Sequence, residues 1–120
     1  MTITKIEKNG IVCAVVKGDH PLITDTQSAL DVLMTVKYEA ETKNIVMSKE
    51  LIVEDFFILS TGLAGDILQR YINYGGRMAI YGDYSHYTSR PLHDFIYESN
   101  KGKDVFFVAT EDEAIEMLTR

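Results

Sequence analysis

The chain has 120 residues, of which 46% are hydrophobic and 25% charged, enough to bury the core of one globular domain over residues 1–120. The formal net charge of −6, without any basic stripe, excludes the class of proteins that hold nucleic-acid phosphates. Cys13 is the single cysteine and cannot form an internal disulfide, and the N-terminal run MTITKIEKNG carries neither a targeting nor a membrane-spanning pattern. We therefore expect a cytoplasmic protein that binds neither nucleic acid nor membranes.

The first predicted elements are two strands and a helix. Residues 2–7 and 11–17 are strand-like, and the Asn-Gly pair between them is typical of a tight hairpin turn. Thr24 and Gln27 have the spacing of a capping box, and apolar residues at helical period follow them. The pattern predicts a β-hairpin and then a helix that runs to about Tyr38.

The rest of the chain alternates between strands and helices. Short buried runs at 43–48, 77–83 and 104–110 predict strands, and their non-alternating apolar residues are typical of parallel strands. Ser89 and Thr110 stand where the caps of the last two helices are expected. The order ββαβαβαβα predicts an α/β fold, a mixed β-sheet covered by about four helices. Right-handed crossovers should gather the carboxyl ends of its parallel strands at one edge.

The stretch DFFILSTGLAGDILQ, residues 55–69, has the period of a helix but contains residues that weaken one. Apolar side chains recur every three or four positions from Phe56 to Tyr71, which predicts a helical face that ends before Gly75-Gly76. Two hydroxyls and two glycines interrupt this face, where leucine or alanine would be better helix formers.

Two interpretations of these interruptions stay open. Ser60 or Thr61 can cap the helix, and the same free N–H groups make the position suitable for an anion. Gly62 and Gly65 have no side chain, so another backbone or a ligand can approach closely. The segment is either a cap with close helix–sheet packing, or a phosphorylation or anion site at Ser60, Thr61 and Gly62.

The residues around this segment resemble a known family. A strand and a loop precede the hydroxyl-hydroxyl-Gly-Leu sequence from Ser60 to Leu63, and a helix, a Gly-Gly pair and a strand that ends in Gly82 follow it. This layout is similar to the sulfate transporter and anti-sigma factor antagonist (STAS) domain. The resemblance implies that a partner kinase phosphorylates Ser60 and so switches binding to an anti-sigma factor. The chain departs from the family's Asp-Ser-Ser-Gly-Leu pattern at Leu59.

A second resemblance covers most of the chain. The runs LITDTQSALDVL, VEDFFILSTGLAGDILQ and HDFIYESN resemble an uncharacterised bacterial family, domain of unknown function 4180. The resemblance implies a small stand-alone cytoplasmic protein and no particular activity.

The loop GDYSHYTSRPLHDF, residues 82–95, leaves a predicted strand at its carboxyl end. The residues that we expect to form a ligand or partner edge there are Ser48, Asp83, Tyr84, His86 and Arg90. His86 with Asp83 or Asp94 would make an acid–base pair, and the alternative is a polar surface loop with a helix cap. Two histidines seven positions apart without a cysteine pair do not have metal-site spacing, so we predict neither a metal nor a cofactor.

Two functional hypotheses follow. The first is a regulatory protein-interaction module that is switched at Ser60, with a protein partner or a second copy as its ligand. The second is a small ligand-binding protein or enzyme that uses Asp83, His86 and Arg90. The abundance of tyrosines favours an interface, because amphipathic tyrosines are common there. Three acidic residues lie in the loop after the central strand, Glu50, Glu54 and Asp55. Their carboxylates could hold a proton or a cation, or they are first-turn acids that interact only with helix dipoles.

Overall fold

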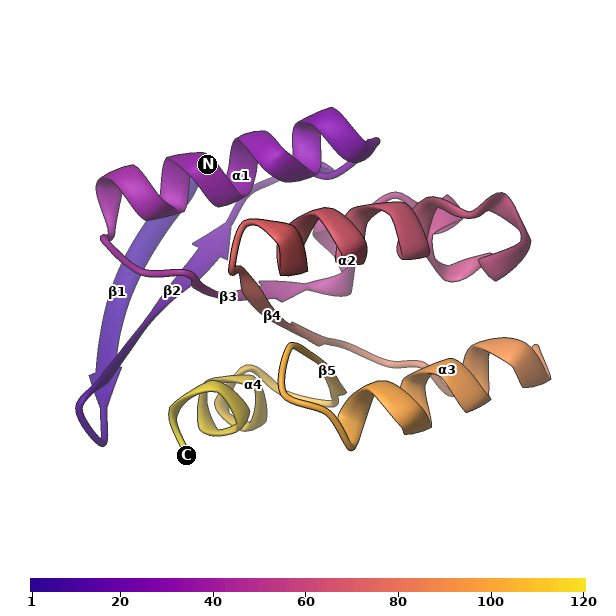
Figure 1. Cartoon of the computed structure of the whole chain (residues 1–120). Coiled ribbons are helices and arrows are strands. Elements are labelled where there is room, and N and C mark those ends of the chain that lie inside the picture. The colour runs from indigo at the N-terminus through magenta and orange to yellow at the C-terminus, as the bar shows by residue number, and fades with distance from the viewer.

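A computed structural model describes residues 1–120 as one mixed sheet with four helices packed on it (Figure 1). The strands are β1 (Thr2–Lys8), β2 (Ile11–Lys17), β3 (Asn44–Ser48), β4 (Arg77–Tyr81) and β5 (Val105–Val108). The helices are α1 (Thr26–Glu39), α2 (Leu63–Asn73), α3 (Arg90–Asn100) and α4 (Glu111–Thr119). Three short 3₁₀ helices, η1 (Lys49–Leu51), η2 (Glu54–Phe57) and η3 (Leu59–Thr61), connect β3 to α2. The predicted α/β class and mixed sheet are confirmed.

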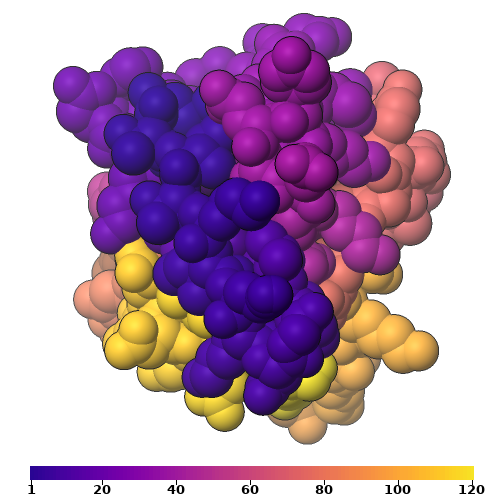
Figure 2. Space-filling view, turned by 90° about the vertical axis from the view of Figure 1, so that its left-hand side faces the viewer, coloured from indigo at the N-terminus to yellow at the C-terminus, as the bar shows by residue number.

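The chain opens with the predicted hairpin. β1 and β2 pair antiparallel, and the turn residues Asn9 and Gly10 both have positive φ angles, 56° and 77°. A tight turn of this kind needs two residues that tolerate the left-handed region, and Asn-Gly is the preferred pair. β1 pairs with the sheet on one side only, and Figure 2 shows the indigo N-terminal segment lying across the visible face of the molecule.

The remaining strands are parallel neighbours, as predicted. In the central register Val46 of β3 lies opposite Ala79 of β4, which in turn lies opposite Phe106 of β5. β2 joins the same parallel set through β3. Because the strands follow one another across the sheet in chain order, every crossover advances in the same direction. Right-handed crossovers then place their helices on one face.

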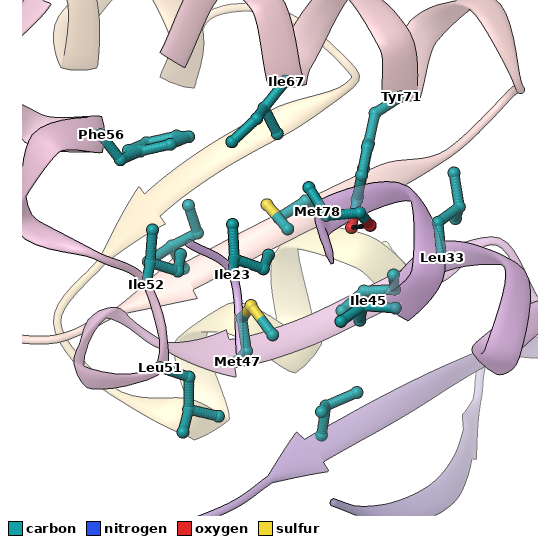
Figure 3. Packing of buried hydrophobic residues seen from close by; sticks show 14 of the residues in the cluster. Ile23, Leu33, Ile45, Met47, Leu51, Ile52, Phe56, Ile67, Tyr71 and Met78 are labelled. Carbon is teal, nitrogen blue, oxygen red and sulfur yellow. Dashed lines mark hydrogen bonds between the residues drawn. The ribbon is translucent and has the colours of Figure 1, made fainter. Parts of the chain in front are cut away.

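The two faces of the sheet are covered unequally. α1, α2 and α3 pack on one face over a cluster of 22 buried residues, whereas α4 covers the other face over a cluster of 8. In Figure 3, Ile67 and Tyr71 reach from α2 toward Met78 of β4. The buried Tyr71 hydroxyl donates a hydrogen bond to the Ala29 carbonyl at 2.7 Å and so links α2 to α1.

The cap of α1 differs from the prediction by one position. Asp25 is the N-cap: its carboxylate accepts from the Ser28 N–H at 2.7 Å, and the Ser28 hydroxyl accepts from the Asp25 N–H at 3.0 Å. The Gln27 side chain instead donates to Asp31 one turn later. The expected pairing of Thr24 with Gln27 is therefore wrong, because the adjacent Asp–Ser pair satisfies the same free N–H groups.

The apolar stripe from Phe56 to Tyr71 is not one helix. Phe56 lies in η2, and α2 begins only at Leu63, after Gly62 adopts a left-handed φ of 79°. The two ends of the stripe are nevertheless buried, because η2 directs Phe56 into the core and α2 does the same with Tyr71. An apolar period of three to four does not distinguish an α-helix from successive 3₁₀ turns.

The caps of the last two helices are those predicted. The Ser89 hydroxyl accepts from the Leu92 N–H at 3.3 Å, and the Thr110 hydroxyl accepts from the Glu113 N–H at 3.2 Å.

None of the four helices has the length and apolar character needed to cross a lipid bilayer.

Candidate functional site

The carboxyl edge of the sheet contains a groove that joins two segments far apart in the sequence. One wall comes from η2 and η3, and the other from the connection between β4 and α3. We call this hollow of about 360 Å³ the Ser60 groove. Its lining residues are Glu54, Phe57, Ile58, Leu59, Ser60, His86, Tyr87, Thr88, Ser89 and Pro91. Ser60 and His86, which belong to separate sequence motifs, thus line the same surface.

The two neighbouring hydroxyls in this groove region have different roles. The Thr61 hydroxyl lies 2.8 Å from the Asp55 carbonyl oxygen and 2.9 Å from the Ile58 carbonyl oxygen, and it accepts from the Leu63 N–H at 3.2 Å. Thr61 therefore ties η2, η3 and the start of α2 together. Ser60 is exposed, and its hydroxyl makes no hydrogen bond within the chain.

The two glycines beside these hydroxyls also differ. Gly62 has a φ of 79°, so it is required for its backbone conformation rather than for close packing. A Cβ atom at Gly65 would meet no other atom within 4 Å. The expectation that another backbone approaches Gly65 closely is wrong, because no atom of another segment lies within 4 Å of that position.

Lys49 is a residue of this edge that the sequence analysis missed. It follows β3 directly, and only 8% of its side chain is exposed. Its stem crosses Gly82, where a Cβ atom would lie 2.5 Å from Lys49 Cγ. The ammonium lies 5.4 Å from the centroid of the Phe57 ring and 5.3 Å from that of Tyr87, close enough for cation–π attraction. The sequence holds no signal for this position, since lysine is seldom buried.

An aromatic cluster surrounds Lys49. Phe57 and Tyr87 stack with their centroids 5.6 Å apart, and Tyr84 packs 6.0 Å from Phe57. The Tyr84 hydroxyl donates to the Ile80 carbonyl at 2.9 Å, and its burial raises its pKa. The Tyr87 hydroxyl is buried near the Glu54 carboxylate, without a hydrogen bond of good geometry. Burial, and then the neighbouring Glu54 carboxylate, raise the pKa of Tyr87.

The tyrosines that we expected at an interface therefore divide into two groups. Tyr71, Tyr81, Tyr84 and Tyr87 belong to the core or its margin, where their rings are packed. Tyr74 and Tyr97 are exposed, with 51% and 63% of their surface accessible. Tyr38, with 87% of its surface accessible, is exposed as well.

The polar loop after β4 does not form the expected acid–base pair. Asp83 accepts from the Ser85 N–H at 2.9 Å, and hydrogen bonding from Ser85 lowers the pKa of Asp83. Asp94 pairs with Arg90 at 4.0 Å on the surface. The ring of His86 is exposed and lies 4.1 Å from that of Tyr87, without a hydrogen bond to either carboxylate.

The residues predicted for this edge are distributed over separate surfaces. Asp83 and Tyr84 line a wider hollow of about 710 Å³ between the ends of β4 and β5. Ser48 lines a third hollow with Glu50 and Tyr81, and its hydroxyl accepts from the Glu50 N–H at 3.1 Å. Arg90 is exposed and lines none of the three. The carboxyl edge thus brings Ser60 and His86 together and leaves Ser48, Asp83 and Arg90 apart.

Metal-ligating side chains do not converge anywhere in the chain. No group of three or more His, Cys, Asp or Glu residues has the arrangement needed to hold a metal ion. Cys13 lies buried in β2.

Comparison with known proteins identifies a family and no characterised relative. No curated protein matches the chain, and no solved structure matches it. The family model described as domain of unknown function (DUF4180) matches residues 8–118, from the hairpin to the end of α4. The chain therefore belongs to the DUF4180 family.

Proposed function

We propose that this chain is a small cytoplasmic regulatory module, with a fold similar to STAS domains, that binds a protein partner through the Ser60 groove. Phosphorylation of Ser60 would control that binding, in the manner of anti-sigma factor antagonists. The module carries no chemistry of its own in this proposal.

The observation that carries the proposal is the contrast between Ser60 and Thr61. The Thr61 hydroxyl is already used in hydrogen bonds with the backbone of Asp55, Ile58 and Leu63. Ser60 has an exposed hydroxyl without an internal partner, at the rim of a groove, so modification there would not break an existing bond. A phosphate would add about two negative charges at the surface that a partner would contact.

The composition of the groove also favours a protein partner. Ile58 has 48% of its surface exposed beside Phe57 and Pro91, and the hydroxyls of Thr88 and Ser89 lie at the same groove. An apolar centre with polar groups around it is typical of protein interfaces.

The topology favours a protein partner over a small-molecule ligand or substrate. Ligand sites of open α/β sheets commonly lie where the strand order reverses and neighbouring crossovers diverge. Here the strands advance in one direction, so the edge does not contain a crevice of that type. The loop residues His86 and Asp83 are also not joined as an acid–base pair.

The proposal is tested with Ser60→Glu and Ser60→Ala as baits for partner capture from the source cell. We expect wild type and Ser60→Ala to recover the same protein and Ser60→Glu to lose it. The free energy of unfolding of both variants should lie within about 0.5 kcal/mol of the wild-type value, because the Ser60 side chain is exposed and makes no hydrogen bond. Mass spectrometry of the chain purified from that cell should find phosphate on Ser60.

Two neighbouring variants act as controls. Thr61→Ser keeps a hydroxyl and should bind like wild type, whereas Thr61→Ala should lose about 1–2 kcal/mol of stability through its missing hydrogen bonds. Partner recovery that is equal for wild type and Ser60→Glu would contradict the switch. Sedimentation velocity then shows whether a second copy of the chain is the partner.

A further inference from the structure

The two outer strands of the sheet differ in what happens to their free backbone groups. At the β5 edge, the Asn100 side chain covers the outward backbone of Phe107. Its amide nitrogen donates to the Phe107 carbonyl at 3.0 Å, and its amide oxygen accepts from the Phe107 N–H at 2.8 Å. A side chain that satisfies both backbone groups of an edge residue prevents another strand from pairing there. The chain therefore closes this edge itself.

The β1 edge has no such cover. β1 pairs with β2 alone, and Figure 2 shows this indigo segment open at the surface. The backbone of its seven residues forms no hydrogen bond outside that pairing, either with main chain or with side chains. An edge strand in this state is a template for pairing with another strand.

The hairpin geometry shows which residues of β1 present free groups. In a hairpin with a two-residue turn, the pair next to the turn exchanges both hydrogen bonds, and bonded pairs alternate from there. That first pair is Lys8 with Ile11. The N–H and C=O groups of Ile3, Lys5 and Glu7 therefore point away from the sheet.

The side chains of the same strand carry charges of both signs without partners. Lys5 and Glu7 lie opposite apolar residues of β2, and neither forms an ion pair within the chain. Both side chains are exposed, whereas Ile6, which lies between them, is half-buried against the smaller core cluster. The edge thus offers a cation and an anion two positions apart.

These charges distinguish between the ways in which two copies of β1 could pair antiparallel. Since the outward groups belong to odd-numbered residues, odd positions must face odd positions, and three such registers keep most of the strand paired. One places Lys5 opposite Lys5, where like charges are destabilising. Another places Lys5 opposite Ile3 and leaves every charge unpaired. The third places Lys5 of each copy opposite Glu7 of the other.

We infer that β1 pairs with β1 of a second copy in this third register, so that two five-stranded sheets join into one. Lys5 and Glu7 then form two symmetric ion pairs. Ile6 faces Ile6 of the second copy on the twofold axis, in a non-hydrogen-bonded pair whose side chains approach closely. The assembly stops at two copies, because the β5 edges stay covered by Asn100.

The contact is separate from the proposed phosphorylation switch. No residue of β1 lines the Ser60 groove. Self-association through β1 is therefore measured on the purified chain alone, without a captured partner and without modification of Ser60.

Hydrogen exchange of the ¹⁵N-labelled chain at increasing protein concentration tests the pairing residue by residue. We expect the amides of Lys5 and Glu7 to become protected as the concentration rises, because both donate across the new contact. The Ile6 amide already bonds to β2 and should change little. Ile3 should gain no protection, since it lies beyond the paired segment in this register. Protection of Ile3 together with Lys5 would overturn the assigned register.

Charge reversal tests the complementarity of the two strands. Lys5→Glu places a second carboxylate opposite Glu7, and Glu7→Lys places a second ammonium opposite Lys5. Each should weaken self-association, measured by sedimentation equilibrium, about tenfold or more, because both symmetric pairs change at once. An equimolar mixture of the two variants should form a heterodimer, since each offers the charge that the other lacks. Association in the mixture also shows that both variants are folded.

The exposed ion pair of Glu98 and Lys101 on α3 provides matched controls. Its charges lie 3.6 Å apart and away from β1. Lys101→Glu and Glu98→Lys make the same changes in net charge as the two test variants. Both should self-associate like wild type.

Three results would overturn this inference. The first is a wild-type chain that stays monomeric up to about 1 mM. The second is a dimer in which the amides of Lys5 and Glu7 stay unprotected, because such a dimer forms through another surface, for example the Ser60 groove. The third is a mixture of Lys5→Glu and Glu7→Lys that associates no better than either variant alone. None of these results depends on whether Ser60 is modified, so the two proposals fail separately.

Discussion

Asp25 shows how one charged side chain sets the start of a helix. Hydrogen bonds from Ser28 lower the pKa of the Asp25 carboxyl, and its carboxylate accepts from the Ser28 N–H at 2.7 Å. A carboxyl whose pKa is lower in the folded chain stabilises the fold above its ordinary pKa of about 4, and that contribution is lost as the pH falls through the folded-state pKa. We expect Asp25→Asn to lower the melting temperature at neutral pH.

The pH series is the informative measurement, because asparagine is also a good N-cap. The difference in melting temperature between wild type and Asp25→Asn should narrow as the pH falls below about 4, where the wild-type carboxyl becomes protonated. Thermal melts followed by circular dichroism from neutral to acidic pH measure this difference in melting temperature directly. A difference that stays constant across the series would show that the charge of Asp25 has no part in the cap.

At this scale the sequence predicts caps better than buried charges. Ser89 and Thr110 cap their helices as predicted, since a hydroxyl before a helical period has one obvious partner. The pairing at Asp25 was missed by one position because Thr24 offers the same chemistry next to it. Lys49 could not be predicted, because its burial depends on space left by Gly82, a residue 33 positions away.

At the scale of elements, Gly62 and Gly65 should respond to alanine in opposite directions. Gly62 holds a left-handed φ of 79° between η3 and α2, and alanine there should cost about 1–2 kcal/mol. Gly65 lies inside α2 with open space around its Cα, so alanine should stabilise the chain by about 0.5–1 kcal/mol. Each variant is the control for the other.

Urea unfolding of both alanine variants measures these two changes in the free energy of unfolding. If Gly65→Ala is as destabilising as Gly62→Ala, then another group approaches Gly65 closely in solution, which would contradict the open space beside it. The hydrophobic period indicated that the segment is buried, and this is confirmed for Phe56 and Tyr71. The period could not show the break at Gly62, because a single left-handed residue leaves the spacing of the apolar side chains intact.

On the scale of the whole molecule, Arg77 connects three parts of the chain at the amino edge of the sheet. Its guanidinium donates to the Lys103 carbonyl at 2.8 Å and to the Leu118 carbonyl at 3.3 Å, and it lies 3.4 Å from the Asn44 amide oxygen. The Leu118 carbonyl belongs to the last turn of α4, whose carbonyl groups need donors from outside the helix.

We expect Arg77→Ala to lower the free energy of unfolding by about 1–3 kcal/mol, because three acceptors, two of them partly buried, lose their donor together. Hydrogen exchange should accelerate first in α4, which alone covers the smaller core cluster. Arg70→Ala, at an exposed position of α2, is the control and should change stability by less than about 0.5 kcal/mol. Unchanged exchange in α4 would show that Arg77 does not hold that helix.

The overall topology was predictable because its signals are local. Alternating strands and helices, with non-alternating apolar strands, indicated the parallel order of β3, β4 and β5, which the structure confirms. The site was less predictable. Ser60 and His86 belong to separate sequence motifs, and their shared groove depends on how η3 packs beside the connection between β4 and α3. Such packing leaves no pattern in a single sequence.

Mapping the binding surface with the captured partner tests the central claim most directly. The unlabelled partner is added to the ¹⁵N-labelled chain, and backbone amide shifts are recorded for wild type and Ser60→Glu. We predict that the shifts concentrate at residues 54–60 and 86–91, which line the Ser60 groove, and that they disappear in Ser60→Glu. Shifts confined to the exposed Met34 and Tyr38 of α1, or shifts that persist unchanged in Ser60→Glu, would contradict the proposal.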